Sequence, residues 1–164
     1  MTHREKFVAF AMSQVGQTVL WGGRGDMVFD SGLRCLRPTG YAQPVFDCSG
    51  LITTALAFVG APDMRGTHNA QLLCDATPVN AAFTPQAGDF GFYGNGPDSV
   101  IHIVMTLNDG AVLSADGATR RITLLDVAKK AGARVRVHDV QRYRSEPWFS
   151  VHRNTFVDAL DKVC

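Results

Sequence analysis

Apolar residues recur with two different periods along this chain, and the change of period separates a helical first part from a β-rich second part. Thr2 and Glu5 form a capping box ahead of apolar positions three and four residues apart, which predicts an amphipathic helix over residues 3–15. A second apolar run starts at Ser49 and stops at Gly60, where we expect a buried helix.

The second part of the chain consists of short β-rich runs separated by turn sequences. The predicted strands cover residues 90–93, 100–107, 111–115, 134–138 and 148–152. A short helix over 123–131 is expected to end at Gly132. Helices followed by an antiparallel sheet indicate a single α+β domain over residues 1–164, with the N-terminal helices packed on the sheet. Residues 22–44 are rich in Gly, Arg and Pro without a stable period, and we expect an irregular excursion there.

Composition limits the classes of partner. The chain has 164 residues, 46% of them hydrophobic, which is enough for one buried core. Its 16 Lys and Arg residues nearly balance its 15 Asp and Glu residues, and this argues against a nucleic-acid partner, which usually selects a basic face. Since no apolar window reaches the length of a membrane span, we expect no membrane insertion.

The N-terminal segment and the cysteines bear on the compartment. The apolar stretch after Lys6 is too polar and too short for a secretory signal peptide, so we expect synthesis in the cytoplasm. Without a Cys-x-x-Cys pair, we expect no metal and no cofactor. Unpaired thiols are favoured over a structural disulfide. The four cysteines are Cys35, Cys48, Cys74 and Cys164.

Cys48 and His102 are the residues that point to chemistry. Cys48 stands at the start of the second predicted helix, whose unpaired N–H groups and positive end stabilise a thiolate. His102 interrupts an apolar strand, and strand alternation turns it away from the core face expected for Ile101 and Ile103. A histidine in that place can act as a base toward a thiol, which predicts a cysteine–histidine pair.

Five short motifs stand in an order and spacing that carry a family resemblance. They are Trp21-Gly22-Gly23, Asp47-Cys48-Ser49-Gly50-Leu51, Thr67 with Gln71, Ala87-Gly88-Asp89-Phe90, and His102 ahead of a hairpin. Together they resemble the motifs of the NlpC-type endopeptidases, papain-like cysteine peptidases that cut the peptide stems of bacterial peptidoglycan. The resemblance covers most of the chain and implies a papain-like fold.

The resemblance also implies an acyl-transfer mechanism. Cys48 would attack the scissile amide, His102 would exchange the thiol proton, and Ser114, twelve residues after the histidine, would orient its ring. Substrate contacts are expected from the irregular stretch, because guanidinium groups suit the carboxylates of stem peptides. Its candidates are Arg24, Asp26, Arg34 and Arg37. The substrate-binding residues expected beside the nucleophile are Trp21, Asp47, Ser49 and His68.

Two positions depart from the family pattern. The family usually carries a Tyr where this chain has Val19, so one hydrogen bond is missing or supplied elsewhere. Ser114 is a shorter orienting residue than the usual His, Asn or Gln. With a three-residue loop over 108–110, both Ser114 and Asp116 share the face of His102, and a carboxylate holds an imidazolium better than a hydroxyl does. Both residues stay open as the third member of the site; a two-residue loop would turn both away.

The leading expectation is a peptidoglycan endopeptidase from a phage or prophage. It would act on the cell wall after release as a lysin, or as a tail-associated virion component with phage structural proteins as further partners. Val19 and Ser114 motivate one alternative, an inactive structural or binding module of the same fold. A second alternative is an amidase or acyltransferase on a non-murein substrate, because a fold does not fix its substrate.

Overall fold

The computed structural model describes residues 1–79, 84–117 and 122–163, so Cys164 lies outside the described residues. The helices are α1 (His3–Ser13), α2 (Cys48–Phe58), α3 (Ala70–Asp75), α4 (Leu125–Lys130), α5 (Gln141–Arg144) and α6 (Thr155–Asp161). The strands are β1 (Gly23–Gly25), β2 (Met27–Asp30), β3 (Cys35–Pro38), β4 (Val45–Phe46), β5 (Phe90–Gly96), β6 (Ser99–Thr106), β7 (Ala111–Asp116), β8 (Arg134–Asp139) and β9 (Trp148–His152).

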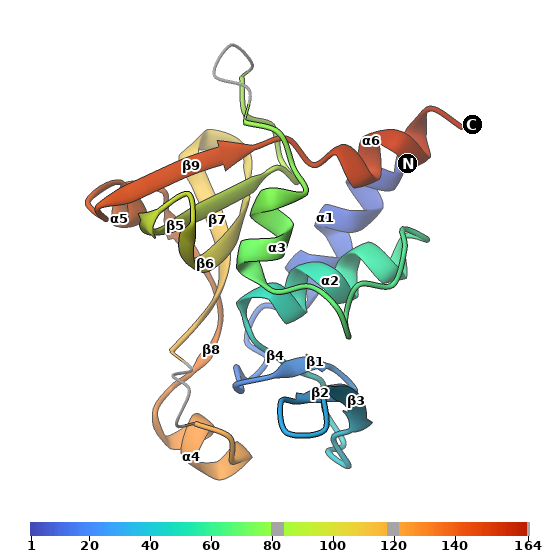
Figure 1. Cartoon of the computed structure of the whole chain (residues 1–164), viewed down its shortest axis with the longest axis vertical. Coiled ribbons are helices and arrows are strands. Elements are labelled where there is room, and N and C mark those ends of the chain that lie inside the picture. Colours follow the sequence, from blue (N-terminus) through green and yellow to red (C-terminus); the bar gives the residue numbers. More distant parts are fainter. Residues whose placement is uncertain (80–83, 118–121, 164) are drawn as a thin grey trace.

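The strands form two antiparallel sheets in an α+β arrangement, as the sequence predicts. The larger sheet has the order β8-β7-β6-β5-β9, and the smaller has the order β3-β2-β1-β4. Helices α1, α2 and α3 lie beside the larger sheet, the smaller sheet lies beyond α2, and the two ends of the chain lie close together (Figure 1). Within the described ranges, no helix is long and apolar enough to cross a membrane.

The capping box predicted for the first helix is present. The side chain of Thr2 accepts the Glu5 N–H at 3.1 Å, and the Glu5 carboxylate accepts the Thr2 N–H at 2.8 Å. Both contacts satisfy donors that the start of a helix leaves unpaired. The helix ends at Ser13, somewhat before the predicted end at residue 15.

Each of the five predicted strands of the second part is observed, and the predicted helix over 123–131 contains α4. Strands β6 and β7 pair with Thr106 opposite Val112, the register of a three-residue connection. Gly110 closes this connection with φ +75°, in the left-handed region. The two-residue alternative is therefore wrong, and Ser114 and Asp116 lie on the strand beside His102.

The expectation of an irregular excursion over residues 22–44 is wrong. Strands β1, β2 and β3 lie within it, and β1 pairs both with β2 and with the more distant β4. These strands have two to four residues, too few to display an alternating pattern. The sequence pattern also does not predict helices α3, α5 and α6. Their four to seven residues complete at most two helical turns, too few to show a helical period.

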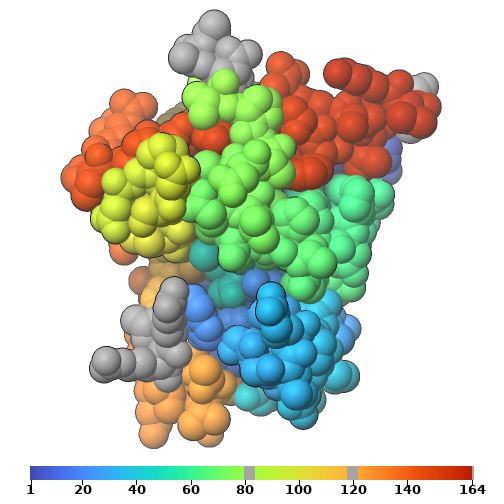
Figure 2. All heavy atoms as spheres, viewed as in Figure 1, coloured from blue at the N-terminus to red at the C-terminus, as the bar shows by residue number. Residues whose placement is uncertain are grey.

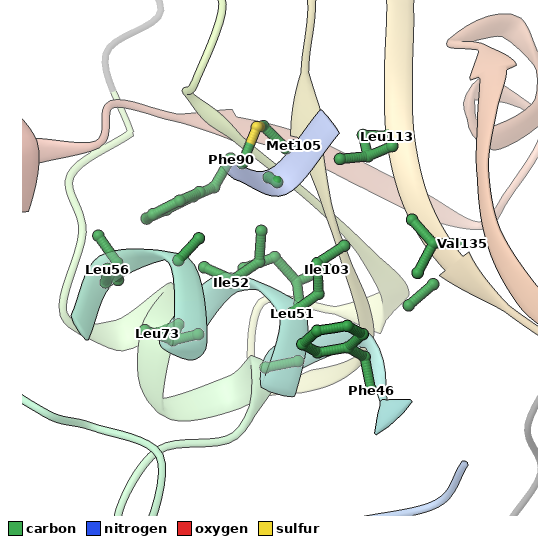
Figure 3. Close-up of a cluster of buried hydrophobic side chains, with 14 of the residues drawn as sticks. Phe46, Leu51, Ile52, Leu56, Leu73, Phe90, Ile103, Met105, Leu113 and Val135 are labelled. Carbon is green, nitrogen blue, oxygen red and sulfur yellow. The ribbon is translucent and has the colours of Figure 1, made fainter. Parts of the chain in front are cut away.

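The main core lies between α2 and the larger sheet (Figure 3). Side chains from α2 meet side chains from β5, β6, β7 and β8 there, and all of those labelled in Figure 3 are almost fully buried. They are Phe46, Leu51, Ile52, Leu56, Leu73, Phe90, Ile103, Met105, Leu113 and Val135. A second, smaller cluster of Val104, Val112 and Tyr143 covers the opposite face of the sheet beneath α5.

A β-bulge overturns the expected facing of Ile101. Tyr93 pairs with His102 whereas Gly94 pairs with Val100, so Ile101 is an extra residue between two paired positions. The bulge leaves Ile101 59% exposed, while Val100 packs against the main core. A bulge re-aims side chains in this way at the edge of many active sites.

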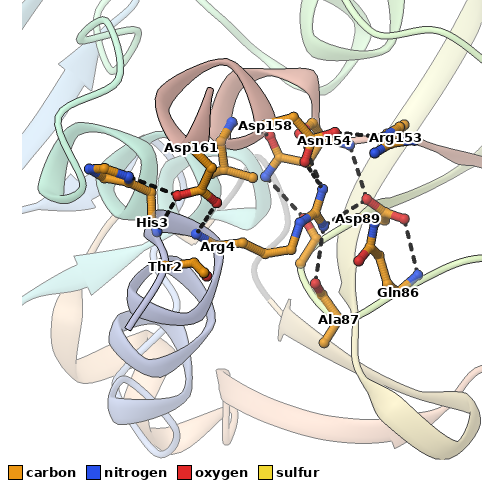
Figure 4. A network of polar contacts seen from close by, with 12 residues as sticks. Thr2, His3, Arg4, Gln86, Ala87, Asp89, Arg153, Asn154, Asp158 and Asp161 are labelled. Atoms are coloured by element: carbon orange, nitrogen blue, oxygen red, sulfur yellow. Dashed lines mark hydrogen bonds and ion pairs between the residues drawn. The ribbon is translucent and has the colours of Figure 1, made fainter. Parts of the chain in front are cut away.

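An ion-pair network joins α1, the start of β5 and α6 (Figure 4). Arg4 donates to the buried Asp89 at 2.9 Å and to Asp158 at 2.7 Å. Asp89 also accepts the N–H groups of Gln86 and Asn154, both at 3.1 Å. Asp89 thereby fixes the turn before β5, and the network attaches the C-terminal helix to the N-terminal one.

Candidate active site

Asp47 is the N-cap residue of α2 and fixes the position of Cys48, the first residue of that helix. Its carboxylate accepts the N–H groups of Gly50 at 2.7 Å and Gly22 at 3.1 Å, together with the hydroxyl of Ser49 at 3.1 Å. These contacts tie the start of α2 to the Trp-Gly-Gly turn. Each carboxylate oxygen of Asp47 therefore accepts a hydrogen bond from the protein, and Asp47 positions the start of α2.

Arg24 completes this arrangement from β1. Its guanidinium is buried, forms an ion pair with Asp47, and donates to the carbonyl oxygens of Gly23 and Arg65, both at 3.0 Å. A buried carboxylate and guanidinium with further hydrogen bonds compensate each other's loss of hydration. Arg24 is thus engaged inside the protein.

His102 lies on β6, and its ring lines the same cavity as Cys48, whose negative charge acts on it. Its Nε2 atom lies 2.7 Å from Oγ of Ser114. Since Nε2 faces Ser114, Nδ1 is the ring nitrogen that remains for Cys48. The ring packs beside two aromatic side chains, with its centroid 4.8 Å from that of Tyr93 and 6.1 Å from that of Tyr143.

Asp116 stands directly behind Ser114. The Ser114 hydroxyl donates to Oδ1 of Asp116 at 2.5 Å, and the same oxygen lies 3.5 Å from Nε2 of His102. His138 forms an ion pair with Oδ2 of Asp116, and the Tyr143 hydroxyl donates to Oδ1 at 3.3 Å. Both residues that the sequence left open for the third position therefore occupy one continuous polar chain.

The charges of the site shift the titration of its members. Burial lowers the pKa of His102, but the negative charges of Cys48 and of Asp116, whose Oδ1 lies 3.5 Å from Nε2, outweigh burial and raise this pKa to about 9. Burial acts to raise the pKa of Asp116, but hydrogen bonds from His102 and Ser114 hold it well below its usual range. Near neutral pH the site therefore contains an imidazolium and a carboxylate.

Two cavities meet at Cys48. The larger one, about 460 Å³, extends toward the smaller sheet and the loop before α3, and includes Arg65, Asn69 and Gln71. The smaller one, about 290 Å³, contains His102 and reaches Arg142. The residues shared by both cavities are Trp21, Asp47, Cys48 and Ile101. Figure 2 shows this side of the molecule hollowed between the blue residues of the smaller sheet and the green and yellow residues of α3 and the β5–β6 hairpin.

The substrate-binding residues expected from the sequence all lie at these cavities. Trp21 is 40% exposed and lines both, while Ser49 and His68 line the larger one. His68 is half-buried, and its Nδ1 lies 2.8 Å from the Thr67 hydroxyl. Neither Asp26 nor the arginines at 34 and 37 line these two cavities; Asp26 and Arg37 instead form surface ion pairs.

His138 and Tyr143 were not recognised from the sequence as neighbours of the site. His138 lies in the predicted strand 134–138, and its register partner on β7 is Val112, four residues from Asp116. The His138 side chain nevertheless contacts the Asp116 carboxylate, a contact that the strand register does not predict. Tyr143 lies on α5, a four-residue helix without a sequence pattern that could have placed it.

A second cysteine–histidine contact has different surroundings. The Cys74 sulfur lies 3.9 Å from Nε2 of His152, and both side chains are buried outside the two cavities. Burial, aided by the charge of Asp75, raises the pKa of Cys74 to about 11, which keeps the thiol protonated. Cys35 is exposed on β3.

Among the described residues, no cluster of three or more His, Cys, Asp or Glu side chains is arranged to hold a metal ion.

The family model described as "NlpC/P60 family" matches residues 16–142, which contain both cavities. This chain belongs to the NlpC/P60 family. The NlpC/P60 family comprises peptidoglycan hydrolases, and the resemblance of the five motifs is thereby confirmed. The family also includes non-catalytic members.

Among curated proteins, this NlpC/P60 chain is similar to peptidoglycan endopeptidase RipB of Mycobacterium tuberculosis, with 31% identity over 128 residues. The match covers 78% of this chain and 49% of RipB, so the chain spans about half the length of the curated relatives it matches. The solved structure of RipB superposes with a TM-score of 0.61 at 25% identity, over 92% of this chain and 64% of RipB.

RipD of Mycobacterium tuberculosis, described as a non-catalytic NlpC/p60 domain protein adapted to peptidoglycan binding, has the same fold. It superposes with a TM-score of 0.62 at 21% identity, over 94% of this chain and 98% of RipD. The papain-like NlpC/P60 fold is thus established for this chain. A phage source stays a prediction, because the named relatives are mycobacterial proteins.

Proposed function

We propose that this chain is a cysteine endopeptidase that hydrolyses amide bonds in peptidoglycan stem peptides. The observation that carries the proposal is the placement of Cys48, at the N-terminus of α2, in one cavity with a His102 ring oriented by Ser114. A nucleophile, a base and a group that orients the base are the three parts that covalent acyl transfer requires. Cys48 and His102 border one cavity, and Ser114 is buried behind the ring of His102.

The first half of the reaction forms a thioester. The Cys48 sulfur attacks the scissile carbonyl carbon while the imidazolium of His102 retains the proton taken from the thiol. When the tetrahedral intermediate collapses, His102 transfers that proton to the leaving amine, and the C–N bond breaks. Water, deprotonated by His102, then attacks the thioester and releases the acid. Because His102 lines the smaller cavity, the leaving side of the substrate lies there and the acyl side lies in the larger cavity.

The oxyanion of the intermediate needs preorganised donors. The backbone N–H of Cys48 belongs to the first turn of α2, where N–H groups have no acceptor within the helix. Tyr93 lines the same cavity as Cys48 and Val19, the residue that replaces the usual Tyr, and offers a phenolic O–H. We assign Tyr93 as the second donor.

The proposal is tested with purified peptidoglycan and mass spectrometry of the released fragments. The wild-type chain is expected to release stem-peptide fragments, and Cys48→Ala should reduce release to background. Cys35→Ser removes an exposed thiol that lines neither cavity and serves as the control that keeps full activity. Undiminished release by Cys48→Ala would show that another group performs the reaction. The fragment masses also identify the cleaved bond.

A binding module without catalysis is the second candidate function. The similarity in fold to RipD and the presence of Val19 motivate it. Labelling with iodoacetamide at pH 6 separates the two candidates, since only a thiolate reacts quickly at that pH. Fast labelling of Cys48 supports the peptidase; labelling no faster than that of Cys35 supports the binding module.

The proposal also covers where the chain acts and which class of substrate it cleaves. We infer that the chain reaches the wall after release from the cytoplasm as a lysin, or as a component of a phage particle. Detection of the chain in purified particles rather than in the lysate would favour the second setting. An amidase or acyltransferase on a non-murein substrate is favoured if peptidoglycan stays intact while Cys48 labels quickly.

A further inference from the structure

The polar chain behind His102 extends further than a cysteine, a histidine and one orienting residue. From the ring it runs through the Ser114 hydroxyl to the Asp116 carboxylate and ends at His138 on the neighbouring strand. Each link is a side-chain hydrogen bond or ion pair. Asp116 and His138 have only 15% and 14% of their side-chain surface exposed, so water competes little with these contacts.

The direction of these hydrogen bonds fixes the state of the ring. The Ser114 hydroxyl donates its hydrogen to Asp116, so its oxygen is left to accept from His102. The proton on Nε2 therefore points to Ser114, and Nδ1 is the ring nitrogen that exchanges a proton with Cys48. A serine alone could rotate its hydroxyl toward Nε2 and favour the opposite tautomer; the carboxylate removes that freedom.

Asp116 itself is held in place from two further sides. His138 binds Oδ2, and the Tyr143 hydroxyl donates to Oδ1, in addition to Ser114. Burial raises the pKa of Tyr143 to about 12, so this hydroxyl keeps its hydrogen. The ring of Tyr143 stacks on that of Tyr93 at 4.8 Å, which fixes the phenol in position.

Two arginine residues also lie near Asp116. Arg134 is its register partner on β8, and Arg142 on α5 lines the same cavity. Neither guanidinium forms an ion pair with Asp116 among the described residues. His138 occupies Oδ2 instead, and so keeps Oδ1 directed at Ser114 and His102.

We propose that Asp116, held by His138, is a positioning residue that orients and charges the His102 ring through the Ser114 hydroxyl. This inference rests on the proposed function for its meaning, but its geometry is independent of the substrate. Ser114 and Asp116 are then no longer alternatives for the third position. Both residues act on His102 together. The Ser114 hydroxyl bonds to the ring, and the Asp116 carboxylate behind it supplies the negative charge.

The test compares the titration of the His102 ring by NMR in Asp116→Asn, His138→Leu, His138→Gln and wild type. Asp116→Asn is expected to lower the midpoint by about one pH unit or more, a tenfold loss of imidazolium at alkaline pH. His138→Leu should shift it in the same direction, whereas His138→Gln retains a donor and should restore most of the wild-type value. Val137→Thr, an exposed neighbour on β8, is the matched control and should titrate like wild type.

An unchanged midpoint in folded Asp116→Asn, or an equal shift in Val137→Thr, would overturn the inference. A shift in Asp116→Asn without one in His138→Leu would overturn the part assigned to His138. If Asp116→Asn does not fold, Ser114→Ala interrupts the same path and should lower kcat while KM stays unchanged; wild-type kcat in that variant would overturn the inference. Shifts as expected in a chain that leaves peptidoglycan intact would contradict the proposed function alone.

Discussion

The backbone of Gly50 in α2 packs against that of Gly23 in β1 so closely that a Cβ atom on Gly50 would lie 1.8 Å from the Gly23 carbonyl oxygen. No side chain fits between these two elements. The approach brings the start of α2 against the smaller sheet and lets Asp47 bind the N–H of Gly22. The glycine two residues after Cys48 is therefore required by the packing of backbone on backbone.

Gly50→Ala should consequently destabilise the chain, although alanine is normally the better helix former. We expect a loss of about 1–3 kcal/mol in the free energy of unfolding, because α2 must move away from β1. Peptidase activity should fall with it, since Cys48 moves with the helix. Gly96→Ala is the matched control, because nothing lies within 4 Å of its added Cβ. Urea unfolding measures both; equal stability of the two variants would contradict the packing argument.

Arg24→Ala is expected to be far more damaging than Arg37→Ala. Removal of the buried guanidinium leaves the Asp47 carboxylate without its ion pair, which costs about 3–5 kcal/mol. Arg37 pairs with Asp30 at the surface with 59% of its side chain exposed, and its loss should cost less than about 1 kcal/mol. Urea unfolding again gives the comparison. Similar losses for the two variants would contradict the stabilising role of the buried Arg24–Asp47 ion pair.

The alkaline limit of activity should reflect the His102 ring. Burial alone would lower its pKa, but Cys48 and Asp116 raise it to about 9, above the ordinary value of 6.5. Raised in the folded state, this group contributes stability in full below about pH 6.5, and the contribution disappears as the pH rises through about 9. Activity should decline over the same alkaline range.

Cys48→Ala removes the negative partner and should lower the His102 midpoint, as measured by NMR. Cys74→Ala, which removes a thiol outside the cavities, is the control and should leave the midpoint unchanged. A His102 midpoint that is the same with and without the Cys48 sulfur would contradict the pairing of the two residues.

Tyr93→Phe tests the assignment of the second oxyanion donor. The phenyl ring can keep the stacking with Tyr143, whereas the hydroxyl is lost. Loss of an oxyanion donor lowers kcat on the order of 100-fold with little change in KM. Tyr41→Phe, outside both cavities, should behave like wild type. A wild-type kcat in Tyr93→Phe would remove Tyr93 from the mechanism.

Ile101→Ala tests whether substrate lies across both cavities. The side chain is 59% exposed and borders each cavity beside Cys48, so its truncation should raise KM several-fold and leave stability almost unchanged. Leu33→Ala removes a similarly exposed apolar side chain, 66% exposed, away from the cavities. Equal KM values for the two variants would indicate that substrate does not contact Ile101.

Local signals in the sequence were sufficient for much of the fold. The capping box of α1, the apolar run of α2 and the left-handed Gly110 after β6 each act over a few residues, and each is observed. The smaller sheet was not predictable in the same way. Its strands are too short for a period, and β1 pairs with β4 across about twenty intervening residues.

The sequence alone determined the α+β order of elements, the family motifs, the position of Cys48 at a helix start and the strand that carries His102. These depend on spacing along the chain. The tertiary structure decided that Arg24 is a buried partner of Asp47, that a bulge turns Ile101 into the cleft, and that His138 reaches Asp116. Such contacts depend on how far side chains extend between neighbouring strands and helices. The periodicity of apolar residues along the sequence does not predict that distance.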